Sequence, residues 1–159
     1  MKESGWLCRT RPKKVPNLGK TYHVTDNKLD RDFQVDKPME KLVTDITYLY
    51  FGNCRLYLSS TVDLYNREIV AYTISECQDT DFVPDTLNQL EIPQGVLLHS
   101  DPGSVYTSKA YYQACIEKGI TRSMSRKETP ADNACIEWFH PVLKSEIFYL
   151  HKWRNLTKD

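Results

Sequence analysis

Hydrophobic and polar residues follow three successive patterns along the 159-residue chain. Residues 1–40 contain three prolines, many charges and no sustained period, which predicts an extended arm ahead of a folded domain. Runs rich in β-branched and aromatic residues then alternate with short turn signals. We therefore predict an antiparallel meander of three strands over 42–51, 55–63 and 68–75, joined by turns at 52–53 and 65–67.

The second half of the chain alternates between helical and strand patterns. In chain order, we predict a helix, a strand, a helix and a strand over 80–90, 95–99, 108–118 and 120–123. Gly119 ends the second helix. A last helix is expected after Thr129, with this threonine as N-cap and Asp132 reaching back to it. The whole pattern predicts an α/β fold, a mixed sheet with helices packed on it.

Two neighbouring stripes run along the last predicted helix. The apolar stripe faces the core and consists of Ile136, Phe139, Leu143, Ile147 and Leu150. The polar stripe consists of Asn133, Glu137, His140 and Lys144. We expect Glu137 to point away from the deepest packing. Pro141 removes the hydrogen bond to the carbonyl of Glu137 and is expected to kink the helix.

The composition is that of one globular domain. Hydrophobic residues make up 40% of the chain and charged residues 26%. No apolar run approaches the ~20 residues that span a bilayer, and the N-terminus has no apolar segment of the kind that marks a secretory signal. The five cysteines form no C-x-x-C pair, so neither a zinc site nor a disulfide framework is indicated. Reduced thiols in a cytosol are expected.

The net charge is zero, with 21 basic and 21 acidic residues, which argues against a protein that coats nucleic acid. The charges are unevenly distributed, however. Basic residues gather over 1–20 and again over 109–127, whereas the acidic excess lies over 26–91. A solvated charged surface and contact with DNA are equally good explanations of this pattern.

Three acidic residues stand out as candidate chemistry. Asp45 lies within a predicted strand on the face of Val43 and Thr47, Asp101 follows a buried strand, and Glu137 lies on the last helix, with 35 residues between it and Asp101. A carboxylate among apolar neighbours needs a cationic partner. Mg²⁺ prefers such oxygen ligands, and two such ions can act together on a phosphodiester. If the three carboxylates converge, they predict a metal site for phosphodiester chemistry.

Each of these acids has a plain structural alternative. Asp45 is compatible with a paired strand acid, Asp101 with a turn former, and Glu137 with a solvated helix acid. His99, two residues before Asp101, is either a group that contacts DNA or a buried structural histidine. Single motif matches do not decide between such alternatives.

The segments around the three acids together resemble the catalytic core of the DDE integrase superfamily. The stretches TDITYLY, YLSSTVDLYNREIVAYTIS and LLHSDPGSVYTSKAYYQACIEKGITRSMSRKETPADNACIEWFHPVLKSE are similar to transposases of bacterial insertion sequences of the insertion-sequence-three type. The resemblance covers roughly residues 8–151. It implies a ribonuclease-H-like fold with a five-stranded mixed sheet. It also implies a catalytic and metal-binding triad of Asp45, Asp101 and Glu137.

The resemblance further implies DNA strand cleavage and transfer of a 3′-hydroxyl, with Mg²⁺ or Mn²⁺ as cofactor, two ions per site when DNA is bound. The partners are the inverted-repeat ends of the element, target DNA and further copies in a homodimer or higher multimer. A cytoplasmic location in bacteria follows, with no membrane partner. The residues expected to contact DNA are Lys144, Asn133, Arg126, Lys127 and His99.

The chain departs from the family pattern at a few positions. Glu128 stands where glycine is common, the usual aromatic pair after the glutamate reads Phe139-His140, and Pro141 interrupts the helix. A catalytically decayed remnant that binds DNA or dimerises therefore stays open, as does a ribonuclease-H-like nuclease acting on its own. We divide the chain into a basic arm (1–40), a catalytic core (41–151) and a truncated tail (152–159).

Overall fold

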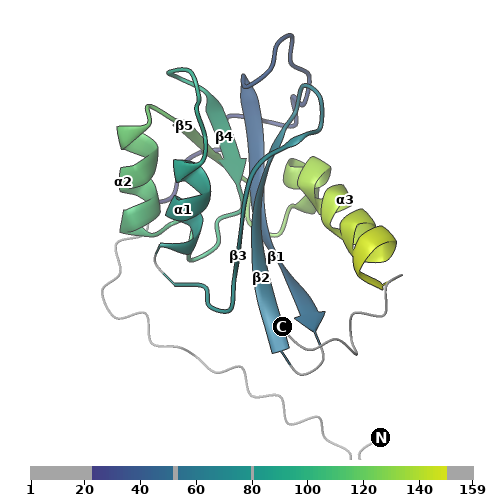
Figure 1. Cartoon of the computed structure of the whole chain (residues 1–159). Coiled ribbons are helices and arrows are strands. Elements are labelled where there is room, and N and C mark those ends of the chain that lie inside the picture. The colour runs from purple at the N-terminus through teal and green to yellow at the C-terminus, as the bar shows by residue number, and fades with distance from the viewer. Residues whose placement is uncertain (1–22, 52–53, 80, 150–159) are drawn as a thin grey trace, which may run out of the picture.

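The computed structural model describes residues 23–51, 54–79 and 81–149, which form a five-stranded sheet with helices on both faces (Figure 1). The strands are β1 (Lys41–Phe51), β2 (Cys54–Asp63), β3 (Ile69–Ser75), β4 (Leu97–Ser100) and β5 (Thr121–Met124). The helices are α1 (Phe82–Asn88), α2 (Lys109–Glu117) and α3 (Ala134–Leu143). A 3-10 turn, η1 (Pro130–Asn133), precedes α3, and a π-helical turn, η2 (Lys144–Tyr149), follows it. Among the described residues, no helix is long and apolar enough to cross a membrane.

The strand order is β3-β2-β1-β4-β5. The pairs β1–β2 and β2–β3 are antiparallel, whereas β1–β4 and β4–β5 are parallel. The predicted mixed sheet is therefore confirmed, although the predicted turn at 52–53 lies outside the described residues. β4 begins two residues later than predicted, because Gly95 has a positive φ of 84° and forms a turn rather than the first residue of the strand.

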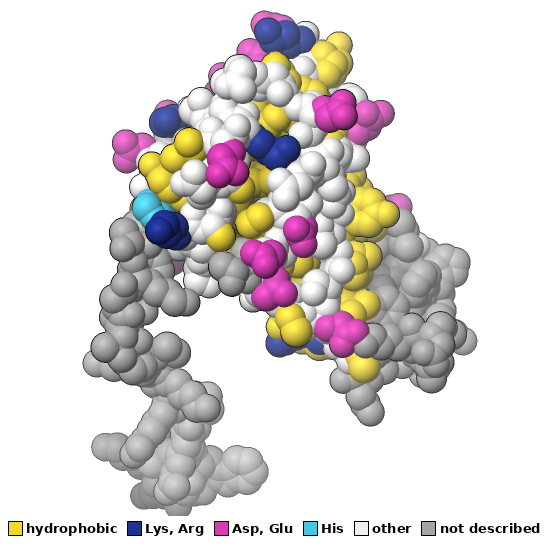
Figure 2. Space-filling model, turned by 60° about the vertical axis from the view of Figure 1, so that its left-hand side comes forward, with side chains coloured by type: hydrophobic (Ala, Val, Ile, Leu, Met, Phe, Trp, Pro, Cys, Tyr) yellow, Lys and Arg dark blue, Asp and Glu magenta, His cyan; other side chains and the backbone are white. Residues whose placement is uncertain are grey.

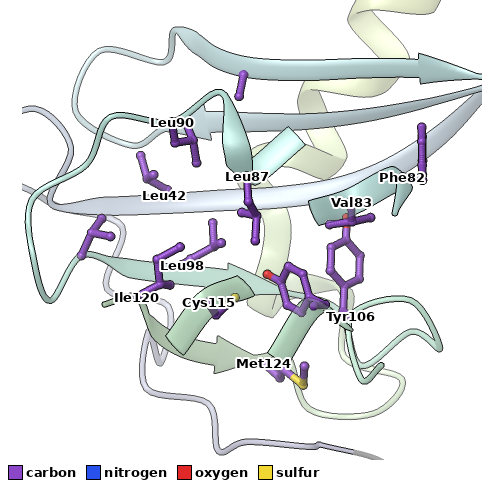
Figure 3. Packing of buried hydrophobic residues seen from close by; sticks show 13 residues of the cluster. Leu42, Phe82, Val83, Leu87, Leu90, Leu98, Tyr106, Cys115, Ile120 and Met124 are labelled. Carbon is purple, nitrogen blue, oxygen red and sulfur yellow. The ribbon is translucent and has the colours of Figure 1, made fainter. Parts of the chain in front are cut away.

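The alternation of side chains along β1 divides the core between the two faces of the sheet. Leu42 packs with residues of α1 and α2 in the larger cluster shown in Figure 3. Val43 points to the other face and packs with Ile136 of α3. Figure 1 shows α1 and α2 on one side of the sheet and α3 on the other. Asp45 lies two residues after Val43 in β1, so its side chain is on the same face of the sheet, the face that α3 covers.

Residues 23–40 lie against the domain, although they contain no helix or strand. Leu29 is buried in the cluster with Val43, and its backbone N–H donates to the Ser123 hydroxyl of β5. The backbone N–H of His23 donates to the carbonyl of Thr107. This part of the predicted arm is therefore a packed part of the fold, and the rest of the arm and the tail over 152–159 lie outside the described residues.

Asp132 ties this N-terminal segment to the start of α3. Its carboxylate is fully buried and accepts hydrogen bonds from Arg126 Nε and Arg31 Nε, both at 2.8 Å. It also accepts from the side-chain amide of Asn27 at 2.9 Å and from the backbone N–H of Arg126 at 3.1 Å. The arginine contacts hold the pKa of Asp132 far below its usual range. We call these four residues the Asp132 clamp.

The predicted capping box at Thr129 is wrong. The Asp132 carboxylate turns to the two arginines instead of reaching back, and Thr129 makes no side-chain cap. The segment after Thr129 consequently winds first as the 3-10 turn η1, and α3 begins only at Ala134.

Pro141 does not end the last helix. α3 continues through Pro141 to Leu143 and passes into η2, where the backbone N–H of Lys144 donates to the carbonyls of His140 and Pro141. Figure 1 draws α3 as one continuous helix. Pro141 cannot donate a backbone hydrogen bond, and the helix continues after it as a wider π-helical turn instead of breaking.

Replacing Asp132 should show how strongly the clamp holds the fold. We expect Asp132→Asn to lower the free energy of unfolding by about 2 kcal/mol, because charge-assisted hydrogen bonds to two arginines are lost. Asp30→Asn is the matched control, since the Asp30 side chain is exposed and its Oδ1 lies 3.4 Å from Arg126 Nη2. Urea denaturation at pH 7 measures both variants. An equal loss in both would contradict a special role of the buried carboxylate.

The depressed pKa of Asp132 also sets a pH window. The folded state holds this carboxyl ionised more strongly than the unfolded chain does, so its contribution is complete above the unfolded pKa of about 4 and declines as the pH falls further. The difference in stability between the wild type and Asp132→Asn should therefore shrink below about pH 4.

Candidate active site

The pairing of β1 with β4 brings Asp45 and Asp101 onto neighbouring segments of the chain. The parallel ladder ends where Val43 lies opposite His99, and Asp45 and Asp101 each follow two residues later. Asp101 itself follows the last residue of β4, where the chain opens into a loop. The two carboxylates therefore come from adjacent strands at the carboxyl end of β4, where ligands of open α/β sheets collect.

Asp101 is half-buried, and burial raises the pKa of its carboxyl group. The negative charge of Asp45 raises this pKa further, whereas the Ser125 hydroxyl and the Asn133 amide lower it. The carboxylate of Asp45, within β1, and that of Asp101, just after β4, thus repel each other. This repulsion favours a cation or a proton at the same position.

Glu137 on α3 belongs to the same electrostatic group. Partial desolvation raises the pKa of its carboxyl group, and the charges of Asp101 and Asp45 add to the effect. Glu137 and Asp101 also line one open pocket of about 130 Å³, together with Ser125, Arg126, Glu128 and neighbouring residues. The charges of the three predicted acids therefore influence one another across the helix that contains Pro141, and of the three only Asp101 and Glu137 line this pocket.

The three carboxylates do not form a closed metal cage by themselves. Among the described residues, no group of three or more His, Cys, Asp or Glu side chains is placed to hold a metal ion. The available donors are all carboxylate oxygens, which match the preference of Mg²⁺ for hard ligands together with water and substrate phosphate. The donor chemistry therefore fits a divalent cation that completes its coordination from outside the protein.

The polar stripe of α3 faces the sheet rather than solvent. Asn133 and His140 are buried, Lys144 is half-buried, and Glu137 alone is exposed. The Nε2 atom of His140 lies 2.9 Å from the Ser60 hydroxyl, and its Nδ1 lies 3.4 Å from Oδ2 of Asp45. Neither contact was indicated by any pattern in the sequence, although the register of the β1–β2 hairpin pairs Ser60 with Asp45.

Lys144 lies near Asp45 and covers the ring of Tyr48, with 4.9 Å between its Nζ and the ring centroid. Desolvation lowers the pKa of the Lys144 ammonium group, and the negative charge of Asp45 partly opposes this shift. A half-buried ammonium group beside the acids is suited to contact a phosphate.

The other residues predicted to contact DNA differ in their surroundings. His99 is fully buried, and its Nδ1 and Nε2 lie 2.8 and 2.9 Å from the hydroxyls of Ser123 and Ser125. The predicted DNA contact by His99 is wrong for this conformation, and the structural alternative holds. Burial lowers the pKa of His99 to about 4, so its ring is neutral at pH 7.

Asn133 is also buried, and its amide faces Asp101. The amide lowers the pKa of Asp101, yet neither of its polar atoms forms a hydrogen bond within 3.5 Å in the described part of the chain. Arg126 is held by the Asp132 clamp but leaves 52% of its side chain exposed, and Lys127 is fully open to solvent. DNA contact by these three residues stays a prediction.

The surface on the side of α1 and α2 gives little support for a nucleic-acid interface there. Figure 2 shows Lys and Arg side chains on this side dispersed among Asp and Glu, without a continuous basic area. The cationic residues beside the acids, Arg126, Lys127 and Lys144, come from the loop before η1 and from the end of α3. Any DNA surface is therefore expected around the three carboxylates.

Comparisons with known proteins identify the family of the chain. The profile of the family described as "Integrase core domain" matches residues 35–130, a stretch that contains Asp45 and Asp101 and ends before Glu137. The chain is 39% identical over 144 residues to the InsK protein of insertion sequence element IS150 from Escherichia coli K12, covering 88% of this chain and 51% of that protein. It is 35% identical over 125 residues to the transposase for insertion sequence element IS904 of Lactococcus lactis, covering 76% and 49%.

The chain spans about half the length of these curated relatives. Among solved structures, it is similar to the HTLV-2 integrase catalytic core domain in complex with magnesium, in a dimeric form. That similarity has a TM-score of 0.57 and 16% identity, covering 76% of this chain and 78% of that one. At this identity the similarity concerns the fold alone, and it confirms the predicted ribonuclease-H-like architecture.

The backbone conformation at Glu128, in the pocket wall, explains why glycine is common at this position. Its φ of 56° lies in the left-handed region, which disfavours residues with a β-carbon. We expect Glu128→Gly to raise the free energy of unfolding by about 1 kcal/mol. Glu128→Gln keeps the β-carbon and removes the charge, so it should give little or no gain. Thermal unfolding compares the two, and an equal gain in both would assign the effect to charge.

Proposed function

Because the chain belongs to the integrase core domain family, we propose that it is the catalytic core of an insertion-sequence transposase. In this proposal it cleaves DNA strands and joins a freed 3′-hydroxyl to another phosphodiester. One observation carries the proposal. β1, which carries Asp45, pairs with β4, which Asp101 follows, and the charges of both aspartates act on Glu137 of α3.

Asp45, Asp101 and Glu137 are the residues that would hold Mg²⁺ or Mn²⁺. Their mutual repulsion and their oxygen donors fit a divalent cation, which would complete its coordination with DNA phosphate and water. Two ions bound there would supply an activated nucleophile and stabilise the leaving oxygen of an in-line displacement.

Residues around the triad would orient the DNA. Lys144 would contact a phosphate as a point charge, and the exposed portions of Arg126 and Lys127 would add charge on the opposite side of the pocket. Asn133 would hold the carboxylate of Asp101 through its buried amide. Such phosphate contacts fix register and orientation without reading sequence.

The proposed partners are the inverted-repeat ends of the element and target DNA. The proposed assembly is a homodimer or higher multimer, because strand transfer needs two DNA ends held together. The HTLV-2 integrase core is described in dimeric form, and that description concerns the viral protein. A cytoplasmic location, with the protein on the nucleoid when it is bound to DNA, completes the proposal.

A catalytically decayed remnant is the second candidate, and Glu128 is the observation in its favour. This residue adds a negative charge to the pocket that contains Asp101 and Glu137, where DNA phosphate has to approach. Pro141 gives the alternative no support, since Glu137 stays within range of both aspartates. A ribonuclease-H-like nuclease differs from both in cutting RNA–DNA hybrids without joining strands.

A nicking and joining assay on an oligonucleotide of the element's end, with Mn²⁺, tests the proposal. We expect Glu137→Gln to lower the rate more than about 100-fold, because a metal ligand is lost. Glu146→Gln is the matched control, since it makes the same change on an exposed residue farther along the same helical segment. Its rate should equal that of the wild type.

The assay also separates the alternatives. Equal inactivity of the wild type and both variants on DNA would contradict the proposal and favour the remnant. Hydrolysis of an RNA–DNA hybrid without strand joining would favour the nuclease.

A further inference from the structure

Asp45, His140 and Ser60 form a continuous polar array between the sheet and α3. Ser60 of β2 pairs directly with Asp45 of β1, so both side chains point to the face covered by α3. His140 of α3 contacts both of them, with 2.9 Å between Nε2 and the Ser60 hydroxyl and 3.4 Å between Nδ1 and Asp45 Oδ2. Three elements of the fold thus meet at one carboxylate of the proposed triad.

The array has the residue types of a serine hydrolase triad, but its geometry excludes that chemistry. Ser60 is fully buried, with no exposed surface, so no substrate reaches its hydroxyl. The side chain of Asp45 keeps 22% of its surface exposed and is the open end of the array. In a serine hydrolase the serine is the accessible residue, whereas here the aspartate is. Ser60 is therefore an anchor rather than a nucleophile.

The acceptors around the His140 ring favour one tautomer. A carboxylate only accepts hydrogen bonds, so a proton that faces Asp45 sits on Nδ1. With the proton there, Nε2 accepts the hydrogen bond of the Ser60 hydroxyl. The distance of 3.4 Å between Nδ1 and Oδ2 is longer than an ordinary hydrogen bond.

We propose that His140 is a positioning residue for Asp45: anchored by Ser60, its Nδ1–H holds Oδ2 of the carboxylate and leaves Oδ1 to face a divalent metal ion. This inference rests on the proposed metal role of Asp45. Repulsion by Asp101 and Glu137 would otherwise turn the Asp45 carboxylate away from the site. A hydrogen-bonded imidazole behind a metal ligand opposes that rotation, as outer hydrogen bonds do at other metal sites.

The chain offers a matched set of substitutions. His140→Phe keeps an aromatic ring in the packing and removes both ring nitrogens, and it restores the aromatic pair usual at this point of the family. His140→Asn keeps a donor close to the position of Nδ1. Ser60→Ala removes the anchor, and Ser59→Ala is its control, because the Ser59 hydroxyl is equally buried but has no hydrogen-bond partner among the described residues.

Calorimetric titration with Mn²⁺ is the first measurement. We expect His140→Phe to weaken Mn²⁺ binding about tenfold, and Ser60→Ala to weaken it less. His140→Asn should recover most of the affinity, and Ser59→Ala should bind as the wild type does. A packing role alone would leave affinity unchanged in His140→Phe and gain nothing from asparagine. Folded His140→Phe and Ser60→Ala variants with wild-type affinity would therefore overturn the proposal.

Nitrogen-15 NMR of the metal-free protein separates this inference from the proposed function. We expect the His140 proton on Nδ1, and we expect its resonance to shift in Asp45→Asn. A wild type that binds no Mn²⁺ contradicts the proposed function, yet the NMR result still tests whether His140 holds Asp45. A neutral ring with its proton on Nε2 overturns the inference whatever the metal titration shows.

Discussion

Repulsion among three carboxylates is the constraint on which the rest of the structure depends. Asp45 and Asp101 lie on neighbouring segments because β1 and β4 pair in parallel, and α3 adds the charge of Glu137, whose pKa both aspartates raise. Left to themselves, such groups would move apart or take up protons. Every element around them therefore has to be rigid, and the central strands β1 and β4 supply that rigidity from within the sheet.

Helix α3 is held by contacts other than strand pairing, because no strand follows it in the described part of the chain. The Asp132 clamp provides such contacts by joining Asn27 and Arg31, on the N-terminal segment, to Arg126 just before η1. One fully buried carboxylate thus holds the start of the helix that carries Glu137. Farther along, His140 and Lys144 turn the polar side of the helix toward Asp45. The same helix therefore supplies an acid, an imidazole and an ammonium group to the site.

The sheet and the order of its elements could be predicted from the sequence, because strand alternation and helical spacing are local patterns, whereas the role of the three acids stays a prediction. The role of Asp132 could not be predicted, since its partner Arg31 lies 101 residues away in sequence and local spacing suggested a cap. The same holds for the buried position of His99, which depends on two serines distant in sequence. The helical spacing placed His140 on the polar face of the last helix, as the structure does. Its contact with Ser60 depends on the packing of α3 against the β1–β2 hairpin and could not be predicted. Local signals predicted the elements, and long-range packing decided the side-chain partners.

The thermal unfolding of wild type and Asp101→Asn, each with and without Mn²⁺, tests most directly whether the carboxylates form a metal site. Without metal, the variant should be the more stable protein, because the neutral amide of asparagine removes the repulsion from Asp45 and keeps a polar partner for Ser125. Mn²⁺ should raise the melting temperature of the wild type alone. A less stable metal-free variant, or an equal rise with Mn²⁺ in both proteins, would contradict the account.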